Sequence, residues 1–168
     1  MLIIDDLSRP HPENALGRNW QYVADTVMGG VSTGTISRKS FAGREALWLS
    51  GSVSLENNGG FIQMATDLAA RGEVLNASAF TALELTVIGN DESYNVHLRT
   101  PDVNRPWQSY RQSFQAASRW TVVTLPFADF EPYRLDETLD TARLVRLGIV
   151  AVGRAMDADV AISEIKLI

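Results

Sequence analysis

The chain consists of short runs in which apolar and polar residues alternate, separated by turns rich in glycine, proline and asparagine. Alternation sends successive side chains to opposite faces of a strand, so it predicts β-strands with one buried face. Amphipathic runs of ten or more residues, which a helical bundle or a parallel α/β sheet requires, are missing. About ten short strands therefore predict an all-β fold, a jelly-roll β-sandwich of two antiparallel sheets with at most short helical turns.

Residues 48 to 61 show this pattern most clearly. Their alternation stops at an Asn-Asn-Gly-Gly turn, 57–60, and an apolar run follows it. Glycine pairs supply backbone conformations with positive φ and permit close approach, so we expect this turn to be a hinge of the sandwich. A second Gly-Gly pair closes the turn 25–30, where Asp25 is expected to accept hydrogen bonds from turn amides.

Later segments carry more specific expectations. Gly51 is expected to separate two short strands, 45–50 and 53–55. Asp136 is placed to cap a short helix within 136–145. The apolar run that ends at residue 152 predicts a strand that is buried on both faces or lies in the centre of the sheet. A phase change in the last strand predicts a β-bulge near 163–164.

Length and composition favour one domain over residues 1–168. A net charge of -5 disfavours a nucleic-acid or anionic-membrane binder, since such binding needs clustered Lys and Arg. The absence of cysteine excludes disulfides and thiolate sites. No signal-like N-terminus and no apolar run of about 20 residues are found, so we expect a cytoplasmic protein without membrane insertion.

Catalytic and metal sites find little support. The only histidines, His11 and His97, cannot form a three-histidine zinc site, and no serine lies in a Gly-x-Ser-x-Gly elbow. Acidic residues are available for a glycosidase pair, but the sequence does not pair them. Asp157 and Asp159 have a spacing that a structural calcium site would use, which alone is weak support. We therefore expect no enzyme, no cofactor and no metal.

One predicted sheet face has the character of a recognition surface. Planar polar side chains beside an aromatic ring suit a sugar or a partner polypeptide, because hydrogen bonds fix orientation while the ring supplies apolar contact. An ordinary solvated sheet face is the alternative. The candidate ligand- or partner-binding residues are Glu84, Asn95, His97, Arg99, Trp107 and Arg111.

A second set of residues forms motifs that resemble the complex I intermediate-associated protein family. The Asp-x-Val-Met-Gly-Gly-x-Ser and Asn-Asn-Gly-Gly-Phe elements, in this order, are the specific part, and the resemblance covers about residues 15 to 167. The motif residues are Trp20, Asp25, Met28, Gly29, Gly30, Ser32, Asn57, Asn58, Gly59, Gly60, Phe61, Trp120, Pro126 and Phe127.

The resemblance implies a jelly-roll sandwich similar to galactose-binding domains. For the mitochondrial members it implies a chaperone-like role in assembling NADH:ubiquinone oxidoreductase. Two hypotheses follow. The first is a non-enzymatic binding or assembly module with a protein partner, such as a respiratory-complex subunit. The second is a domain that binds a carbohydrate or another small ligand.

Overall fold

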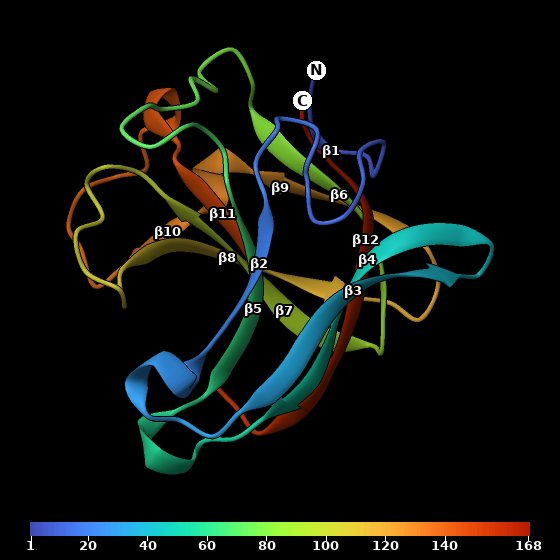
Figure 1. The fold of residues 1–168 in the computed structure, drawn as a ribbon. Coiled ribbons are helices and arrows are strands. Elements are labelled where there is room, and N and C mark those ends of the chain that lie inside the picture. Colours follow the sequence, from blue (N-terminus) through green and yellow to red (C-terminus); the bar gives the residue numbers. More distant parts are fainter.

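The computed structural model describes all of residues 1–168 and shows two antiparallel six-stranded sheets packed face to face (Figure 1). The predicted jelly-roll sandwich is confirmed. The first sheet has the order β3-β4-β12-β6-β9, with β1 also paired to β12, and contains β1 Leu2–Asp5, β3 Thr33–Phe41, β4 Arg44–Val53, β6 Ala82–Gly89, β9 Thr121–Pro126 and β12 Met156–Leu167. The second has the order β10-β8-β7-β11-β5-β2 and contains β2 Trp20–Ala24, β5 Phe61–Asp67, β7 Glu92–Arg99, β8 Ser109–Ala116, β10 Glu131–Tyr133 and β11 Arg146–Val152.

Helical structure is limited to single turns. They are the 3-10 turns η1 Asp25–Met28, η2 Glu56–Asn58, η3 Phe127–Asp129 and η4 Thr141–Arg143. None of them has the length and hydropathy that a membrane-crossing helix needs. The two chain ends lie together, because Leu2 of β1 is paired with Leu167 of β12 (Figure 1).

The core lies between the sheets and follows the predicted alternation. In β7, Tyr94, Val96 and Leu98 are buried against the other sheet, while the intervening residues face outward. Strand β11 lies between β7 and β5, and its outward Val150 is as buried as its inward Ile149. The expectation of a strand buried on both faces is therefore confirmed.

Strand β4 corrects one expectation. It is continuous through Gly51, which the sequence analysis placed between two strands. Gly51 lies opposite Gly34 of β3, and a Cβ at Gly51 would come within 2.1 Å of the Thr33 carbonyl oxygen and 2.9 Å of Ile62 Cδ1. The glycine therefore allows close contact between β3, β4 and the opposite sheet, and does not interrupt the strand.

The helix cap expected at Asp136 is also wrong. The short turn η4 begins later, and Asp140 caps it by accepting a hydrogen bond from the Ala142 amide. Asp140 lies next to the turn and so reaches its free amides, which Asp136 does not. The expected bulge is confirmed, since the pairing of β12 with β6 shifts between Ile162 and Glu164.

The two Gly-Gly turns share one buried carboxylate. Asp25 has no exposed surface and accepts hydrogen bonds from the Ser32 amide and hydroxyl and from the amides of Gly60 and Phe61. A Cβ at Gly30 would come within 2.5 Å of this carboxylate, so no larger residue fits there. The carboxylate does accept amide hydrogen bonds, but the predicted donors in its own turn are wrong: the amides come from Ser32, just after that turn, and from Gly60 and Phe61 at the second turn. Figure 1 shows η1 and η2 side by side at one end of the sandwich.

Candidate functional site

A cleft of about 540 Å³ lies on the outward face of the second sheet. Its floor comes from β7, β8, β11 and β5, and its edges come from η1, the 100–108 loop and β10. We call it the sheet cleft. The residues that line it are Val23, Val27, Met28, Phe61, Gln63, His97, Arg99, Pro106, Trp107, Gln108, Ser109, Arg111, Tyr133, Arg146, Gly148, Val150 and Val152.

The centre of the cleft floor consists of a glycine, Gly148, and an uncharged histidine, His97. Gly148 lies between His97 on β7 and Ala65 on β5, and the Gln63 side chain reaches over it, since a Cβ at Gly148 would come within 2.6 Å of Gln63 Oε1. Burial, together with the nearby charges of Arg111 and Arg99, lowers the pKa of His97 to about 3. His97 is therefore uncharged at neutral pH, and its Nε2 atom has no hydrogen-bond partner in the protein.

Two arginines stand beside this floor. Arg111 is the register partner of His97, and its guanidinium carbon lies 3.6 Å from the centre of the Tyr133 ring. Its Nε donates to the Ser109 hydroxyl at 2.8 Å. Arg99 donates to the carbonyls of Arg105, Pro106 and Gln108 at 3.2–3.4 Å, so it holds the 100–108 loop against the sheet.

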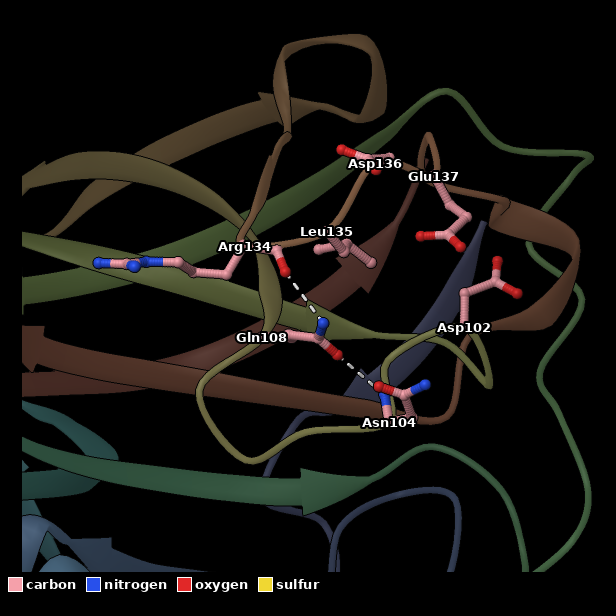
Figure 2. A pocket seen from close by; sticks show the side chains of 7 residues that line it. All are labelled: Asp102, Asn104, Gln108, Arg134, Leu135, Asp136 and Glu137. Atoms are coloured by element: carbon pink, nitrogen blue, oxygen red, sulfur yellow. Dashed lines mark hydrogen bonds between the residues drawn. The ribbon is translucent and has the colours of Figure 1, made fainter.

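Gln108 fixes the wall between this loop and β10. Its side-chain oxygen accepts from the amides of Asn104 and Arg105, and its side-chain nitrogen donates to the Arg134 carbonyl at 2.9 Å. Figure 2 shows Gln108 between these two segments. Gln108 therefore holds the loop that carries Trp107 both to its own earlier residues and to the segment after β10. Trp107 itself makes no polar contact.

The edge of the sheet cleft is apolar and accessible. Val27 and Met28 on η1 are 72% and 52% exposed, Trp107 is 55% exposed and Tyr133 is 38% exposed. Exposed apolar side chains of this size are informative when they gather around a concave surface. Here they surround a floor that carries polar and charged groups, an arrangement typical of small-molecule sites.

The sequence-predicted site residues are only partly brought together. His97, Arg99, Trp107 and Arg111 all line the sheet cleft. Asn95 faces the same side of β7 but lies beyond the lining residues.

The expectation that Glu84 shares this face is wrong. Glu84 lies on β6 in the other sheet, where its carboxylate pairs with Lys166 at 3.3 Å. Alternation predicts the face of a strand that a residue occupies, and does not predict the sheet to which the strand belongs.

The predicted motif residues have mostly structural surroundings. Trp20 donates to Asp5 at 2.7 Å, and Trp120 donates to the Phe41 carbonyl. Asn57 and Asn58 adopt left-handed backbone conformations in the second turn, which asparagine tolerates. Pro126 ends β9 and Phe127 is buried after it. Met28 and Phe61 differ from these residues because they also line the sheet cleft.

Sequence reasoning missed several lining residues. Gln63 and Gly148 come from β5 and β11, which are distant along the chain from the predicted face. Tyr133 stacks on Arg111 because β10 pairs with β8. The only signal for Tyr133 was an aromatic residue after Pro132, which does not indicate where the segment docks.

A second hollow of about 510 Å³ lies behind Gln108 and is polar (Figure 2). Three acids line it, Asp102, Asp136 and Glu137, and Arg143 binds Asp102 at 2.8 Å. The structure contains no group of three or more potential metal-binding side chains. The pair considered for calcium is not free either, since Asp159 accepts from Trp48 Nε1 at 2.7 Å.

Comparison with solved structures places this fold among carbohydrate-binding modules. The family 11 carbohydrate-binding module from Clostridium thermocellum in complex with a β-1,3-1,4-mixed-linked tetrasaccharide is 14% identical, with a TM-score of 0.75 over 99% of this chain and 94% of that chain. A family 30 carbohydrate-binding module is 14% identical, with a TM-score of 0.66 over 99% and 87%. An exo-β-agarase is 9% identical, with a TM-score of 0.63 over 100% of this chain and 25% of that chain. At these identities the likeness establishes the fold.

Sequence comparison gives the family. No curated protein sequence matches this chain. The profile of the family described as Complex I intermediate-associated protein 30 matches residues 11–161, which include both Gly-Gly turns, Asp25 and every strand that forms the sheet cleft. Because that match spans most of the chain, the protein belongs to the complex I intermediate-associated protein 30 family.

Proposed function

We propose that this protein is a non-catalytic binding module that holds a carbohydrate in the sheet cleft. The observation that carries the proposal is the cleft itself, about 540 Å³ in volume and bordered by exposed aromatic residues above a polar floor. Small-molecule sites fall in the range of about 300–1,000 Å³ and combine apolar walls with a few polar groups. A flat solvated sheet face would lack this volume.

The lining suits the chemistry of a sugar. A sugar ring presents an apolar C–H face and a rim of hydroxyls. Trp107 offers an exposed flat apolar surface, while Gln63 and Ser109 offer hydrogen-bonding groups from the strands. The fold shared with carbohydrate-binding modules, one of them solved with a tetrasaccharide, supports the same class of ligand.

The lining does not suit hydrolysis of that sugar. Glycosidases use two carboxyl groups on either side of the bond that they cleave. No carboxylate lines the sheet cleft. His97 is the only imidazole in the lining, and it does not take up a proton at neutral pH because its pKa is about 3. The ligand is therefore held without being transformed.

Titration calorimetry with a panel of soluble oligosaccharides tests this function. We expect saturable binding of at least one oligosaccharide with no new reducing ends, and binding about 10-fold weaker in Trp107→Ala. Val122→Ala is the matched control, since Val122 is 58% exposed on the other sheet. Absence of binding across the panel, or equal affinity in Trp107→Ala, would contradict the proposal.

A protein partner is the second candidate, favoured by apolar side chains outside the floor of the cleft. Val27 and Met28 on η1 and Leu55 before η2 are each more than half exposed at the same end of the sandwich. The family description supports a partner from respiratory complex I assembly. A pull-down from the native host with the parent protein and Val27→Asp tests this. Recovery of a complex I subunit by the parent alone supports the role, and equal recovery by both counts against it.

A further inference from the structure

The sheet cleft carries positive charge that no protein carboxylate balances. None of its 17 lining residues is acidic, although the whole chain has a net charge of -5. Of its three arginines, Arg146 alone is paired, with Asp67 at 2.9 Å. Arg99 and Arg111 form no ion pair with any acid of the chain. Glu131 is the register partner of Arg111 on β10, yet it is not within ion-pair distance.

Both unpaired guanidinium groups are half-buried, and burial lowers the pKa of each. Taking a charge out of water costs free energy unless an opposite charge or good hydrogen bonds replace the water. Arg99 has only carbonyl acceptors at 3.2–3.4 Å, which are long hydrogen bonds. Arg111 uses Nε on Ser109, and its two terminal nitrogens have no acceptor in the protein.

The terminal nitrogens of Arg111 also have a fixed orientation. Stacking on Tyr133 at 3.6 Å and the bond to Ser109 hold the guanidinium plane, so its outer edge is a preset fork of donors. Such a fork matches the two oxygens of a carboxylate, or two oxygens of a sulfate, in bidentate fashion. A neutral sugar hydroxyl would leave most of this capacity unused.

We infer that the ligand of the sheet cleft is an acidic saccharide, whose anionic substituent pairs with Arg111 and lies near Arg99. This inference rests on the proposed carbohydrate-binding function and adds the charge of the ligand. The anionic group is a carboxylate, as in a uronic acid unit, or a sulfate ester. The cleft, about 540 Å³ in volume, leaves room for the ring that carries this anionic group.

The test is titration calorimetry with four probes. They are an oligogalacturonate, its fully methyl-esterified form of equal length, a sulfated oligogalactoside and an oligoglutamate peptide. We expect the oligogalacturonate or the sulfated probe to bind at least about 10-fold more tightly than the ester, with affinity that falls as salt is added. Preference between these two probes identifies the carboxylate or the sulfate as the bound group.

Protein variants locate the contact. Arg111→Gln is expected to weaken binding of the acidic saccharide about 10- to 100-fold, and to weaken binding of the ester much less. Arg111→Lys keeps the charge but loses the two parallel donors. Its affinity for the acidic saccharide is expected to lie between those of the parent and Arg111→Gln. Arg119→Gln removes the same charge from an exposed position that follows β8 and is not part of the cleft lining, and should match the parent. Thermal unfolding of each variant checks that the fold is kept.

The outcomes separate this inference from the function on which it rests. Equal binding of acid and ester, unaffected by Arg111→Gln, overturns the acidic ligand and leaves carbohydrate binding intact. Binding of no saccharide overturns both. Binding of the peptide alone, with loss in Arg111→Gln, also overturns the saccharide inference, because the positive cleft would then serve an acidic polypeptide.

Discussion

Replacing Asp25 by alanine should be among the most destabilising single changes to this protein. The carboxylate is buried and accepts from the amides of Ser32, Gly60 and Phe61 and from the Ser32 hydroxyl. The hydroxyl keeps a second acceptor, the Ser54 carbonyl at 3.3 Å, so three amides are left without a partner. A buried donor without an acceptor costs about 1–3 kcal/mol.

Three such amides give a loss of at least about 3 kcal/mol, and we expect about 3–5 kcal/mol, as for removing one partner of a buried charged pair. This is a large part of the ~5–15 kcal/mol that stabilises a typical domain. Urea unfolding followed by tryptophan fluorescence measures it. The midpoint should fall by about 1–2 M relative to the parent. Asp129→Ala is the control, because Asp129 is exposed and accepts no side-chain hydrogen bond.

The same carboxylate gives a pH dependence with a defined sign. Burial alone would raise the pKa of Asp25, but hydrogen bonds from Ser32, Gly60 and Phe61 outweigh it and hold the pKa below its ordinary value. The folded state therefore binds this proton less readily than the unfolded state. Its contribution to stability is complete above the unfolded pKa of about 3.9 and is lost as pH falls through the lower folded value.

Comparison with Asp25→Asn isolates the pH-dependent contribution of the Asp25 carboxylate to the free energy of unfolding. Burial raises the pKa of Asp5, which has the opposite effect on stability, but Asp5 is present in both proteins and cancels. The stability difference between parent and Asp25→Asn should be constant above about pH 5 and shrink below about pH 4. A urea midpoint for Asp25→Ala equal to that of Asp129→Ala would refute the shared-carboxylate argument.

Three further changes test other parts of the structure. Gly51→Ala should lower the free energy of unfolding by about 1–3 kcal/mol, measured by urea unfolding, because its Cβ meets the rigid Thr33 carbonyl. Gly148→Ala should cost less, because its Cβ comes closest to the flexible end of Gln63. Tyr94→Phe removes bonds to Asn90 and Asp159 and should cost about 1–3 kcal/mol, and ultraviolet titration of the parent should show one tyrosine with a pKa of about 12. Arg99→Gln should speed chymotrypsin cleavage after Trp107, since it frees the loop; equal rates in Arg99→Gln and Arg119→Gln would contradict this.

The sequence predicts the faces of strands well because side-chain alternation is a local property. His97, Arg99 and Arg111 are correctly placed together because β7 and β8 are consecutive and antiparallel, and consecutive strands commonly pair. The position of Trp107 beside them is predictable too, since Trp107 lies in the loop that joins β7 and β8. The arrangement of these four residues therefore needs only local information.

The rest of the site depends on pairings that are distant along the chain. β11 brings Gly148 next to His97, and β5 then brings Gln63, across more than 30 residues each. Alternation contains no information on these neighbours, and the same limit explains why Glu84 was assigned to the wrong sheet. The volume of the cleft also depends on long-range packing, because its edges come from η1, the 100–108 loop and β10, which are separate parts of the chain.

Asp25 connects the recognisable motif to the site without belonging to it. The carboxylate has no exposed surface, so it cannot touch a ligand, yet it fixes the turn that carries Val27 and Met28 and the first residue of β5, Phe61. All three line the sheet cleft. A change at Asp25 must therefore alter stability and binding together, whereas a change at exposed Trp107 should alter binding alone. The motif is then a structural requirement for the edge of the cleft, whereas the charged and imidazole groups of the floor, His97, Arg99 and Arg111, lie outside the motif.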